Sequence, residues 1–484
     1  MIGPTGQVVI GIYLLSLLLL GWLGRRARQA DSLADFYLAG RGLGLATLFL
    51  SLYATQYSGN ALVGYPATAY RQGFQFLNSL TFMLGIVGVY WLFAGRLHRL
   101  ARAHSYVTPG DLIRHRYGSR RLALVLNIVF IAVLASYILA NLKAIGQVLQ
   151  AVTDGQVDFA VAVWCAAVVM VVYESLGGMR SVAWTDAIQG VLLLAGCLTI
   201  FVALEVRFDG ISNLLTQLRT VRPEFWDPPG ATDLARYASL IIVVAFGAAV
   251  YPQAIQRIYA ARSGPVLRRS LQLLLVMPLL TITLVLIIGY AGAALVPGLD
   301  RAASEGITLA VLADLITAVP ELRWMFVLFL AAALAAIMST VDSALLSLSS
   351  IFAQDLYGAR RPDATQSQLT RAGKVFSWII MALMATLAIY LPQTIWQLTV
   401  IKLEVLCQAA PAVIAAVQSR RPSAPALVAG VVTGLVVVLG LRAAAATGWL
   451  PSDSPGGFES GLLGLLANVF IVWLVGKNSR TNLG

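Results

Sequence analysis

Charge is scarce in this chain. Only 12% of its 484 residues are Asp, Glu, Lys or Arg, whereas 59% are hydrophobic and the mean hydropathy is +0.80. An average soluble domain is about 25% charged and roughly 45–50% apolar. The shortage of charge excludes a water-soluble enzyme of ordinary composition, and the apolar excess excludes a disordered chain.

Cysteine and histidine are also rare, with three of each. The cysteines lie in apolar runs without CxxC spacing, so no disulfide framework or zinc site is indicated. The histidines all fall in one basic segment between residues 98 and 115. Because no metal cluster and no nucleophile–base pair is visible within the apolar runs, we expect a protein that is not an enzyme and that has no organic cofactor.

Long hydrophilic segments are missing as well. The longest expected loops, around 207–235 and 296–321, leave no room for a soluble catalytic domain. Most of the chain consists of apolar runs of about 20 residues, the length that crosses about 30 Å of hydrocarbon. The predicted fold class is therefore an all-α polytopic membrane protein in a lipid bilayer. We expect about thirteen spans, near residues 6–24, 44–69, 75–95, 122–150, 157–175, 185–206, 236–259, 266–295, 322–350, 371–391, 395–417, 425–447 and 459–476.

The basic residues set the expected orientation. If the N-terminus lies outside, the inner loops hold 24 of the 34 Lys and Arg residues, with Arg257–Arg269 counted as one such loop, and the outer loops hold eight. Such a bias is what the positive-inside rule predicts. It also explains the net charge of +12 without nucleic acid as a partner. We expect a multi-pass protein of the plasma (inner) membrane with a cytoplasmic C-terminus.

Two spans contain helix breakers at mid-depth. Residues 51–70 read SLYATQYSGNALVGYPATAY and include Pro66, and residues 244–261 read VAFGAAVYPQAIQRIYAA and include Pro252. Proline removes a helical hydrogen bond and clashes with the preceding turn. In a bilayer the freed backbone groups need partners, so an interrupted helix lines a cavity or binds a ligand. A packing kink is the alternative for either helix alone.

The interrupted spans lie five spans apart, which indicates two five-helix units of opposite polarity. Interrupted helices at equivalent positions of inverted repeats indicate a transporter's mid-membrane site. We expect repeats at 44–207 and 236–417, preceded by an extra helix and loop in 1–43 and followed by two helices and a tail in 418–484. The candidate solute ligands beside the breaks are Gln56, Ser58, Asn60, Ala61, Tyr251 and Gln253.

Ionisable side chains inside spans are costly and are candidates for function. Asp186 and Asp342 lie in the sixth and ninth spans. We interpret Glu174 as an interfacial residue at the end of the fifth span. Lys402 and Glu404 are two residues apart and cannot share a helix face, and we interpret both as structural.

The ninth span is rich in small oxygen-bearing side chains. Ser339 and Ser343 are four residues apart, and Ser339 and Asp342 are three apart, so each pair shares a helix face. Hydroxyl and carbonyl oxygens suit a hard monovalent cation such as Na⁺. The alternative is that the hydroxyls bond back to carbonyls of their own helix.

Four blocks carry a resemblance to a known family. They are DFYLAGRGLG (35–44), the block 51–70 quoted above, YESLGGMRSVAWTDAIQG (173–190) and AAALAAIMSTVDSALLSLSSIFAQDLY (331–357). In this order, across essentially the whole chain, they resemble the sodium/solute symporter family. The resemblance implies a LeuT-type fold with a five-plus-five inverted repeat and an extra first helix. It also implies secondary active symport with Na⁺ as the coupling ion.

The same resemblance implies a main Na⁺ site. Carried over by position, its ligands are the carbonyl oxygens of Ala54, Tyr57 and Ala336 and the hydroxyl oxygens of Ser339 and Thr340.

A second cation site of some relatives maps to Asp186, Ser339, Asp342 and Ser343. Asp342 stands where the family more often has Ser, so it either completes a second Na⁺ site or takes a proton. Two carboxylates in a low dielectric repel each other. One of them is therefore expected to be protonated when no cation lies between them.

The resemblance says less about the solute. Positions that are polar in the sugar carriers match Ala61, Leu80 and Met83, which disfavours a sugar, and residues 64–70 resemble the proline and pantothenate carriers more. Free N–H groups at interrupted helix ends suit a carboxylate. We expect Na⁺-coupled import of a small organic solute, with a carboxylate or amino-acid-like one favoured, and no obligatory protein partner. The alternative is a proton-coupled or uncoupled, channel-like facilitator.

Overall fold

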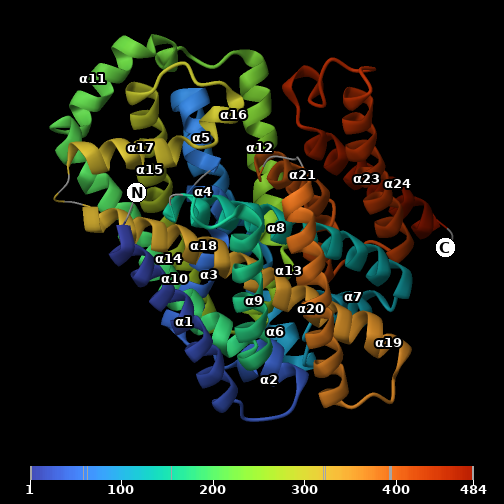
Figure 1. Ribbon diagram of the computed structural model, residues 1–484. Coiled ribbons are helices and arrows are strands. Elements are labelled where there is room, and N and C mark those ends of the chain that lie inside the picture. The colour runs from blue at the N-terminus through green and yellow to red at the C-terminus, as the bar shows by residue number, and fades with distance from the viewer. Residues whose placement is uncertain are drawn as a thin grey trace.

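The computed structural model describes residues 3–57, 59–62, 64–153, 155–319, 321, 323–391 and 395–481. Over these residues the chain is helical, and its only β-type pairing is one isolated bridge. Ten described helices are long and apolar enough to cross a membrane, and three shorter apolar helices accompany them. The all-α polytopic class is confirmed (Figure 1), while the number thirteen stays a prediction.

The N-terminal part of the chain forms the helices that precede and build the expected first repeat. They are α1 (Gly3–Arg26), α2 (Leu33–Leu38), η1 (Ala39–Arg41), α3 (Leu45–Gln56), α4 (Gly59–Leu62), α5 (Gly64–Gln72), η2 (Gly73–Leu77), α6 (Asn78–His104), α7 (Pro109–Tyr117), α8 (Arg120–Val152), α9 (Phe159–Gly177) and α10 (Met179–Phe208).

The remaining described helices follow in chain order. They are α11 (Ile211–Val221), η3 (Pro223–Trp226), α12 (Ala231–Ala249), α13 (Pro252–Ala260), α14 (Gly264–Leu274), α15 (Met277–Leu295), α16 (Arg301–Ser304), α17 (Ile307–Ala318), α18 (Arg323–Ser350), the π-helical segment η5 (Ile351–Tyr357), α19 (Gly358–Arg360), α20 (Gln366–Tyr390), α21 (Ile395–Cys407), α22 (Ala410–Ala416), α23 (Ala424–Ala446), η6 (Pro455–Gly457) and α24 (Ser460–Thr481).

Both predicted interruptions are present. The first lies between α3 and α4, after Gln56, and the second lies between α12 and α13. At the second, the amide of Val250 turns back to the carbonyl of Gly247 at 3.2 Å, and Pro252 opens the new helix. Proline suits a first helical position, where its missing N–H would have had no partner.

Some segments differ from the sequence-based expectation. The spans expected at 266–295 and 395–417 are each divided in two, because Pro278 and Pro411 lie in the first turn of their second pieces. The expected loops at 207–235 and 296–321 contain helices, including α11 and α17. Both helices bury an apolar stripe. This burial offsets the entropy lost when these segments, which are too short to be counted as spans, become ordered.

The core is organised around α18, which packs against α3, α8, α10 and α13. The helices of the two interrupted spans flank it, with α5 and α12 towards the upper end of Figure 1 and α3 and α13 nearer the middle. Small side chains at the contact allow this close packing. A Cβ atom added at Gly196 of α10, for example, would lie 2.5 Å from the Cβ atom of Ala332 in α18.

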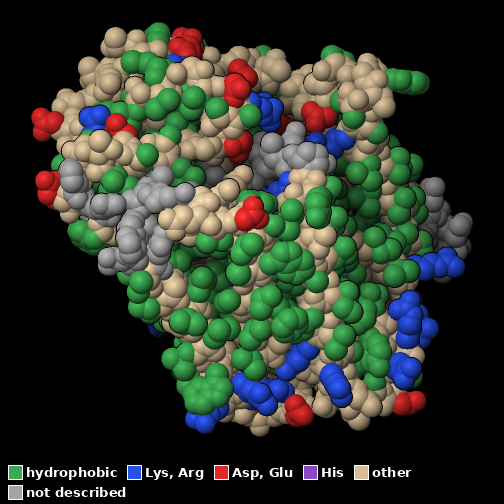
Figure 2. All heavy atoms as spheres, in the orientation of Figure 1, with side chains coloured by type: hydrophobic (Ala, Val, Ile, Leu, Met, Phe, Trp, Pro, Cys, Tyr) green, Lys and Arg blue, Asp and Glu red, His purple; other side chains and the backbone are tan. Residues whose placement is uncertain are grey.

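The two ends of the molecule differ in charge. In Figure 2, Lys and Arg side chains gather at the lower end, over the region of α2 and α19 in Figure 1, and most visible Asp and Glu side chains lie near the upper end. A belt dominated by hydrophobic side chains separates the two ends. This pattern is the one expected when the lower end faces the cytoplasm.

A short backbone bridge joins the two interrupted spans near that lower end. The amide of Leu43 donates to the carbonyl of Ala260 at 3.1 Å, and the amide of Arg262 donates to the carbonyl of Leu43 at 3.0 Å. Leu43 precedes α3, and Ala260 is the last residue of α13. The bridge therefore ties the start of one helix piece to the end of the other.

Candidate functional site

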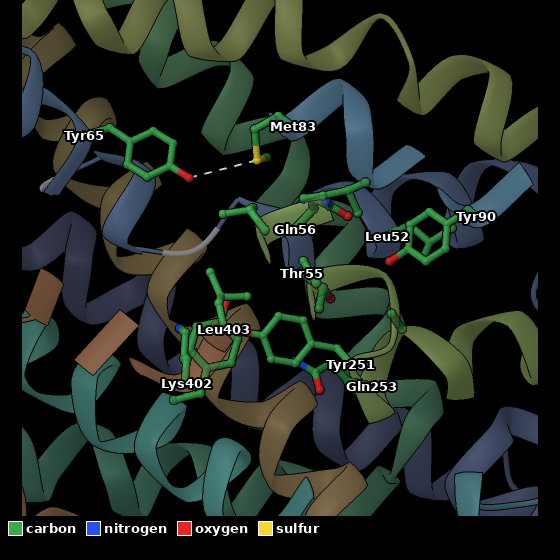
Figure 3. A pocket seen from close by; sticks show the side chains of 15 residues that line it. Leu52, Thr55, Gln56, Tyr65, Met83, Tyr90, Tyr251, Gln253, Lys402 and Leu403 are labelled. Carbon is green, nitrogen blue, oxygen red and sulfur yellow. Dashed lines mark hydrogen bonds between the residues drawn. The ribbon is translucent and has the colours of Figure 1, made fainter. Parts of the chain in front are cut away.

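A cavity lined by residues of both interrupted spans lies between the two interruptions. Its walls come from α3, α5, α6, α8, α12, α13 and α21 and are mainly apolar and aromatic (Figure 3). Three of the predicted solute ligands, Gln56, Tyr251 and Gln253, line it. The cavity therefore lies where the breakers in the sequence indicated a site.

The other predicted solute ligands are placed differently. Ala61 is buried in α4 but does not line the cavity. Ser58 lies outside the described residues, and of Asn60 only the backbone, in α4, is described. The cavity also has polar and aromatic wall residues that sequence reasoning did not assign to it. They are Thr55, Tyr65, Tyr90, Tyr137 and Lys402.

Lys402 and Glu404 face different parts of the protein, as their spacing requires. Lys402 lines the cavity, and its ammonium nitrogen lies 3.2 Å from the centre of the Tyr137 ring. Glu404 faces the C-terminal helices, where Arg442 donates to its carboxylate at 2.6 Å. The contacts of Glu404 agree with a structural role, while the interpretation of Lys402 stays untested. Sequence spacing separates the two faces without saying which one meets a cavity.

The buried charges beside the cavity are dominated by a residue that the sequence analysis misplaced. Arg257 falls within the span expected at 236–259 but is also counted among the inner-loop charges, and in the structure it lies in α13 with no exposed surface. Its Nη2 donates to Asp186 Oδ2 at 2.6 Å and to Ser343 Oγ at 2.5 Å, and its Nε donates to Ser51 Oγ at 2.7 Å. The Ser51 and Ser339 hydroxyls each donate to Asp186 at 2.5 Å. These five residues are called the Asp186 cluster below.

Asp342 lies at the edge of this cluster. The hydroxyl of Tyr173, from α9, donates to Asp342 Oδ2 at 2.5 Å, and the hydroxyl of Ser343 lies 3.4 Å from Oδ1. Asp342 is fully buried, and none of the ion pairs found among the described residues includes it. The residues of the predicted second cation site thus lie near one another, with the guanidinium of Arg257 beside Asp186. The cation site itself stays a prediction.

The residues implied for the main Na⁺ site come from the end of α3 and from α18, two helices that pack against each other. The Thr340 hydroxyl donates to the carbonyl of Ala336 at 3.0 Å, which is the bond back to its own helix that the alternative interpretation expects. Thr55, beside Ala54, approaches Ser343 of α18 at 3.4 Å. The hydroxyl of Thr340 keeps its lone pairs free for a cation while it donates.

Two further observations limit the chemistry. Among the described residues, no group of three or more His, Cys, Asp and Glu side chains could hold a metal ion. Glu174, interpreted as interfacial, is fully buried in α9. Arg180, near the start of the next helix, pairs with Asp35, with distances of 2.7 and 2.8 Å. The arrangement suits binding and transfer of a solute and a monovalent cation.

Comparisons with known proteins agree with this geometry. The family model described as "Sodium:solute symporter family" matches residues 36–434. The chain is 27% identical over 372 residues to the sodium/pantothenate symporter of Haemophilus influenzae, covering 75% of this chain and 73% of that protein. It is 26% identical over 369 residues to the high-affinity proline transporter PutP of Bacillus subtilis, covering 74% and 75%.

A solved structure shows the same fold. The structure described as the substrate-bound outward-open state of a Na⁺-coupled sialic acid symporter superposes with a TM-score of 0.79 at 20% sequence identity. The superposition covers 99% of this chain and 98% of that one. The LeuT-type fold class expected from the sequence is confirmed. The chain therefore belongs to the sodium:solute symporter family, as a multi-pass, Na⁺-coupled secondary transporter of small organic solutes that is not an enzyme.

Proposed function

We propose that the protein imports its solute by alternating access, with the solute bound in the cavity between the two interruptions. The observation that carries this proposal is the shared location of three features. They are two interrupted helices, a cavity lined by their polar residues, and the hydroxyl-rich face of α18. Interrupted helices expose backbone groups only where these line a cavity.

The coupling ion is Na⁺, and we propose that it binds the carbonyl oxygens of Ala54, Tyr57 and Ala336 and the hydroxyl oxygens of Ser339 and Thr340. Coupling requires that Na⁺ bind more tightly to the state that receives the solute, since an ion bound equally by both states shifts nothing. Ser339 contributes to two neighbouring sites, because its hydroxyl also donates to Asp186.

The test is solute uptake into proteoliposomes driven by an inward Na⁺ gradient. Thr340→Ala removes an oxygen from the proposed ion site, and we expect a loss of about 1–3 kcal/mol in Na⁺ binding, as for an unmet buried polar group. Half-saturating Na⁺ then rises, while solute affinity at saturating Na⁺ changes less. Thr386→Ala is a matched control, since Thr386 in α20 is exposed and bonds only to its own helix. Unchanged Na⁺ activation in Thr340→Ala would exclude this ion site.

For the second site we propose that Asp342 exchanges a proton in step with Na⁺ binding. A guanidinium already accompanies Asp186, whereas Asp342 has a tyrosine hydroxyl as its partner. A carboxyl group in such surroundings ionises more readily when a cation arrives nearby. A tyrosine hydroxyl can donate to the ionised form and accept from the protonated form. Na⁺ binding would then release a proton.

The orientation and the solute class are proposed on coarser grounds. The concentration of Lys and Arg at one end (Figure 2) supports a cytoplasmic position for the α2 and α19 end in the plasma (inner) membrane, with the N-terminus outside. Pantothenate, proline and sialic acid, the solutes of the relatives, all carry a carboxylate. We propose a carboxylate-bearing solute for this protein too.

A further inference from the structure

Lys402 is a buried basic side chain without an anionic partner among the described residues. Its side chain is 3% exposed, and its ammonium nitrogen lies against the face of Tyr137. Glu404, the acid nearest to it in sequence, is held by Arg442, Ser460 and the amide of Gly461. An aromatic face attracts a cation but does not neutralise its charge, and an unpaired charge at this depth is costly.

The same cavity contains a second polar side chain with unmet hydrogen bonds. Gln253 is 1% exposed, and neither atom of its amide group has a hydrogen-bond partner in the described structure. Both residues line the cavity (Figure 3). The rings of Tyr137 and Tyr251, which also line it, stack with centroids 5.2 Å apart. Buried polar groups are nearly always hydrogen-bonded. These two unmet groups therefore indicate a ligand with an anionic group and a hydrogen-bonding group.

The rest of the wall defines what else the ligand can carry. The lining residues include Leu52, Met83 and Ile86, which suit a compact, largely apolar body. None of the described lining residues is Asp or Glu. A solute ammonium group would therefore find no carboxylate, whereas a solute carboxylate would find Lys402.

We propose that Lys402 binds the carboxylate of the transported solute and that Gln253 hydrogen-bonds its body. The substrate class is then a small organic monocarboxylate without an ammonium group, which narrows the carboxylate or amino-acid-like class expected from the sequence. This inference rests on the proposed function, which takes the cavity as the solute site. Helix ends beside the cavity offer partial positive charges to a carboxylate, and Lys402 adds a full positive charge to them.

The experiment compares solutes that differ only in the charge of one group. Thermal unfolding of the purified full-length protein is measured in saturating Na⁺ with pantothenate and its alcohol panthenol, and with lactate and lactamide. We expect at least one carboxylate, and neither neutral twin, to raise the midpoint, because only a binder stabilises the folded state. In Lys402→Met we expect the carboxylate shift to fall to a level that indicates at least tenfold weaker binding.

Three controls separate recognition from folding. The stabilisation by Na⁺ alone is expected to persist in Lys402→Met, which shows that the fold and the ion site are intact. Lys402→Arg is expected to keep the preference for a carboxylate. Lys143→Met is the matched control, because Lys143 is another lysine at membrane depth, bonded to the carbonyl of Leu391 and outside the cavity wall.

Several outcomes would contradict the assignment. The role of Lys402 would be overturned if a neutral analogue stabilised the parent protein as much as the matching carboxylate. It would also be overturned if carboxylate binding were unchanged in Lys402→Met. The absence of stabilisation by both carboxylates would have the same consequence. In each case the cavity could still be the solute site. If transported solute still bound normally to Tyr251→Ala and Gln253→Leu, the cavity would not be the solute site, and the proposed function would fail with the inference.

Discussion

Arg257 and Lys402 are two cations buried in the same membrane-embedded core, and their surroundings differ. Arg257 donates to Asp186, Ser51 and Ser343 and also to the carbonyl of Gln253. Lys402 lies on an aromatic ring and faces a cavity. A buried charged group whose hydrogen bonds and ion pairs are all formed holds helices together, because separating the helices would leave that group buried without partners. A buried charged group without a hydrogen bond or ion pair to the protein is available to bind a ligand.

The largest effect is expected at the satisfied charge. Asp186→Ala leaves Arg257 buried without its carboxylate, and breaking a buried pair in this way costs about 3–5 kcal/mol. We expect a large fall in the unfolding midpoint. Replacing both partners with apolar residues, in Asp186→Leu with Arg257→Met, is expected to recover much of that loss. An Asp186→Ala midpoint equal to that of the parent would show that the pair does not hold α10 and α13 together.

A pair closer to water provides a smaller effect with a known pH dependence. Burial disfavours the charged form of Asp35, but its bonds to the Arg180 guanidinium and to backbone N–H groups outweigh burial and hold its pKa below the ordinary 3.8. The ionised carboxylate therefore stabilises the fold above pH 3.8, and this contribution is lost as the pH falls through the lower folded-state pKa.

Asp35→Asn is thus expected to cost about 1.5–3 kcal/mol at pH 7, the usual contribution of hydrogen bonds to a charged group. The measurement is the unfolding midpoint of both proteins between pH 3 and 7. The difference is expected to shrink toward pH 3. Asp31→Asn is the control, because Asp31 forms an exposed ion pair with Arg28. A difference that grows on acidification would contradict the ion-pair explanation.

The proton proposed at Asp342 gives an effect of intermediate size. If one proton leaves for each Na⁺ bound, the Na⁺ dissociation constant falls as the pH rises, by at most tenfold per pH unit. This corresponds to about 1.4 kcal/mol of Na⁺ binding free energy per pH unit. We expect such a dependence between pH 6 and 8 in the parent and a flatter one in Asp342→Ser. Equal slopes in the two proteins would mean that Asp342 is not coupled to the ion.

The smallest effect on stability is expected at the unsatisfied charge. Without solute, Lys402→Met removes a buried charge that has no anionic partner, so we expect an unfolding free energy within about 1 kcal/mol of the parent, or higher. Because Lys402 has no oppositely charged partner, its removal leaves no other charged group buried without a partner. A loss as large as that of Asp186→Ala would show that Lys402 is structural and that the contrast with Arg257 is false.

Sequence reasoning located the interruptions because proline and glycine act locally. Pro252 opens α13 as its chemistry requires, and the polar residues beside it line the cavity. The same local reasoning misplaced Arg257. A basic residue followed by Arg262, Arg268 and Arg269 resembles a loop by composition, and only the packing of α3, α6 and α18 against α13 shows that it is buried.

Long-range contacts explain the rest of what sequence reasoning missed. The separation of Lys402 from Glu404 onto different faces followed from helix geometry alone. Which face met the cavity depended on Arg442, 38 residues away on α23, which takes Glu404 as its partner. The tyrosine that donates to Asp342 lies 169 residues away. No spacing rule within one helix could have predicted either contact.

The backbone bridge at Leu43 has a mechanical consequence. It joins Leu43, two residues before α3, to the end of α13, so the lower pieces of the two interrupted spans are joined at the ends farthest from their interruptions. Because α3 and α13 are joined in this way, we expect them to move as one unit. The hinges of this motion would be the interruptions near Tyr57 and Val250. Those hinges border the cavity. One rotation of this unit about the bound solute would then close the cavity to one side of the membrane and open it to the other. The two interrupted spans would not need a separate mechanism to coordinate their movements.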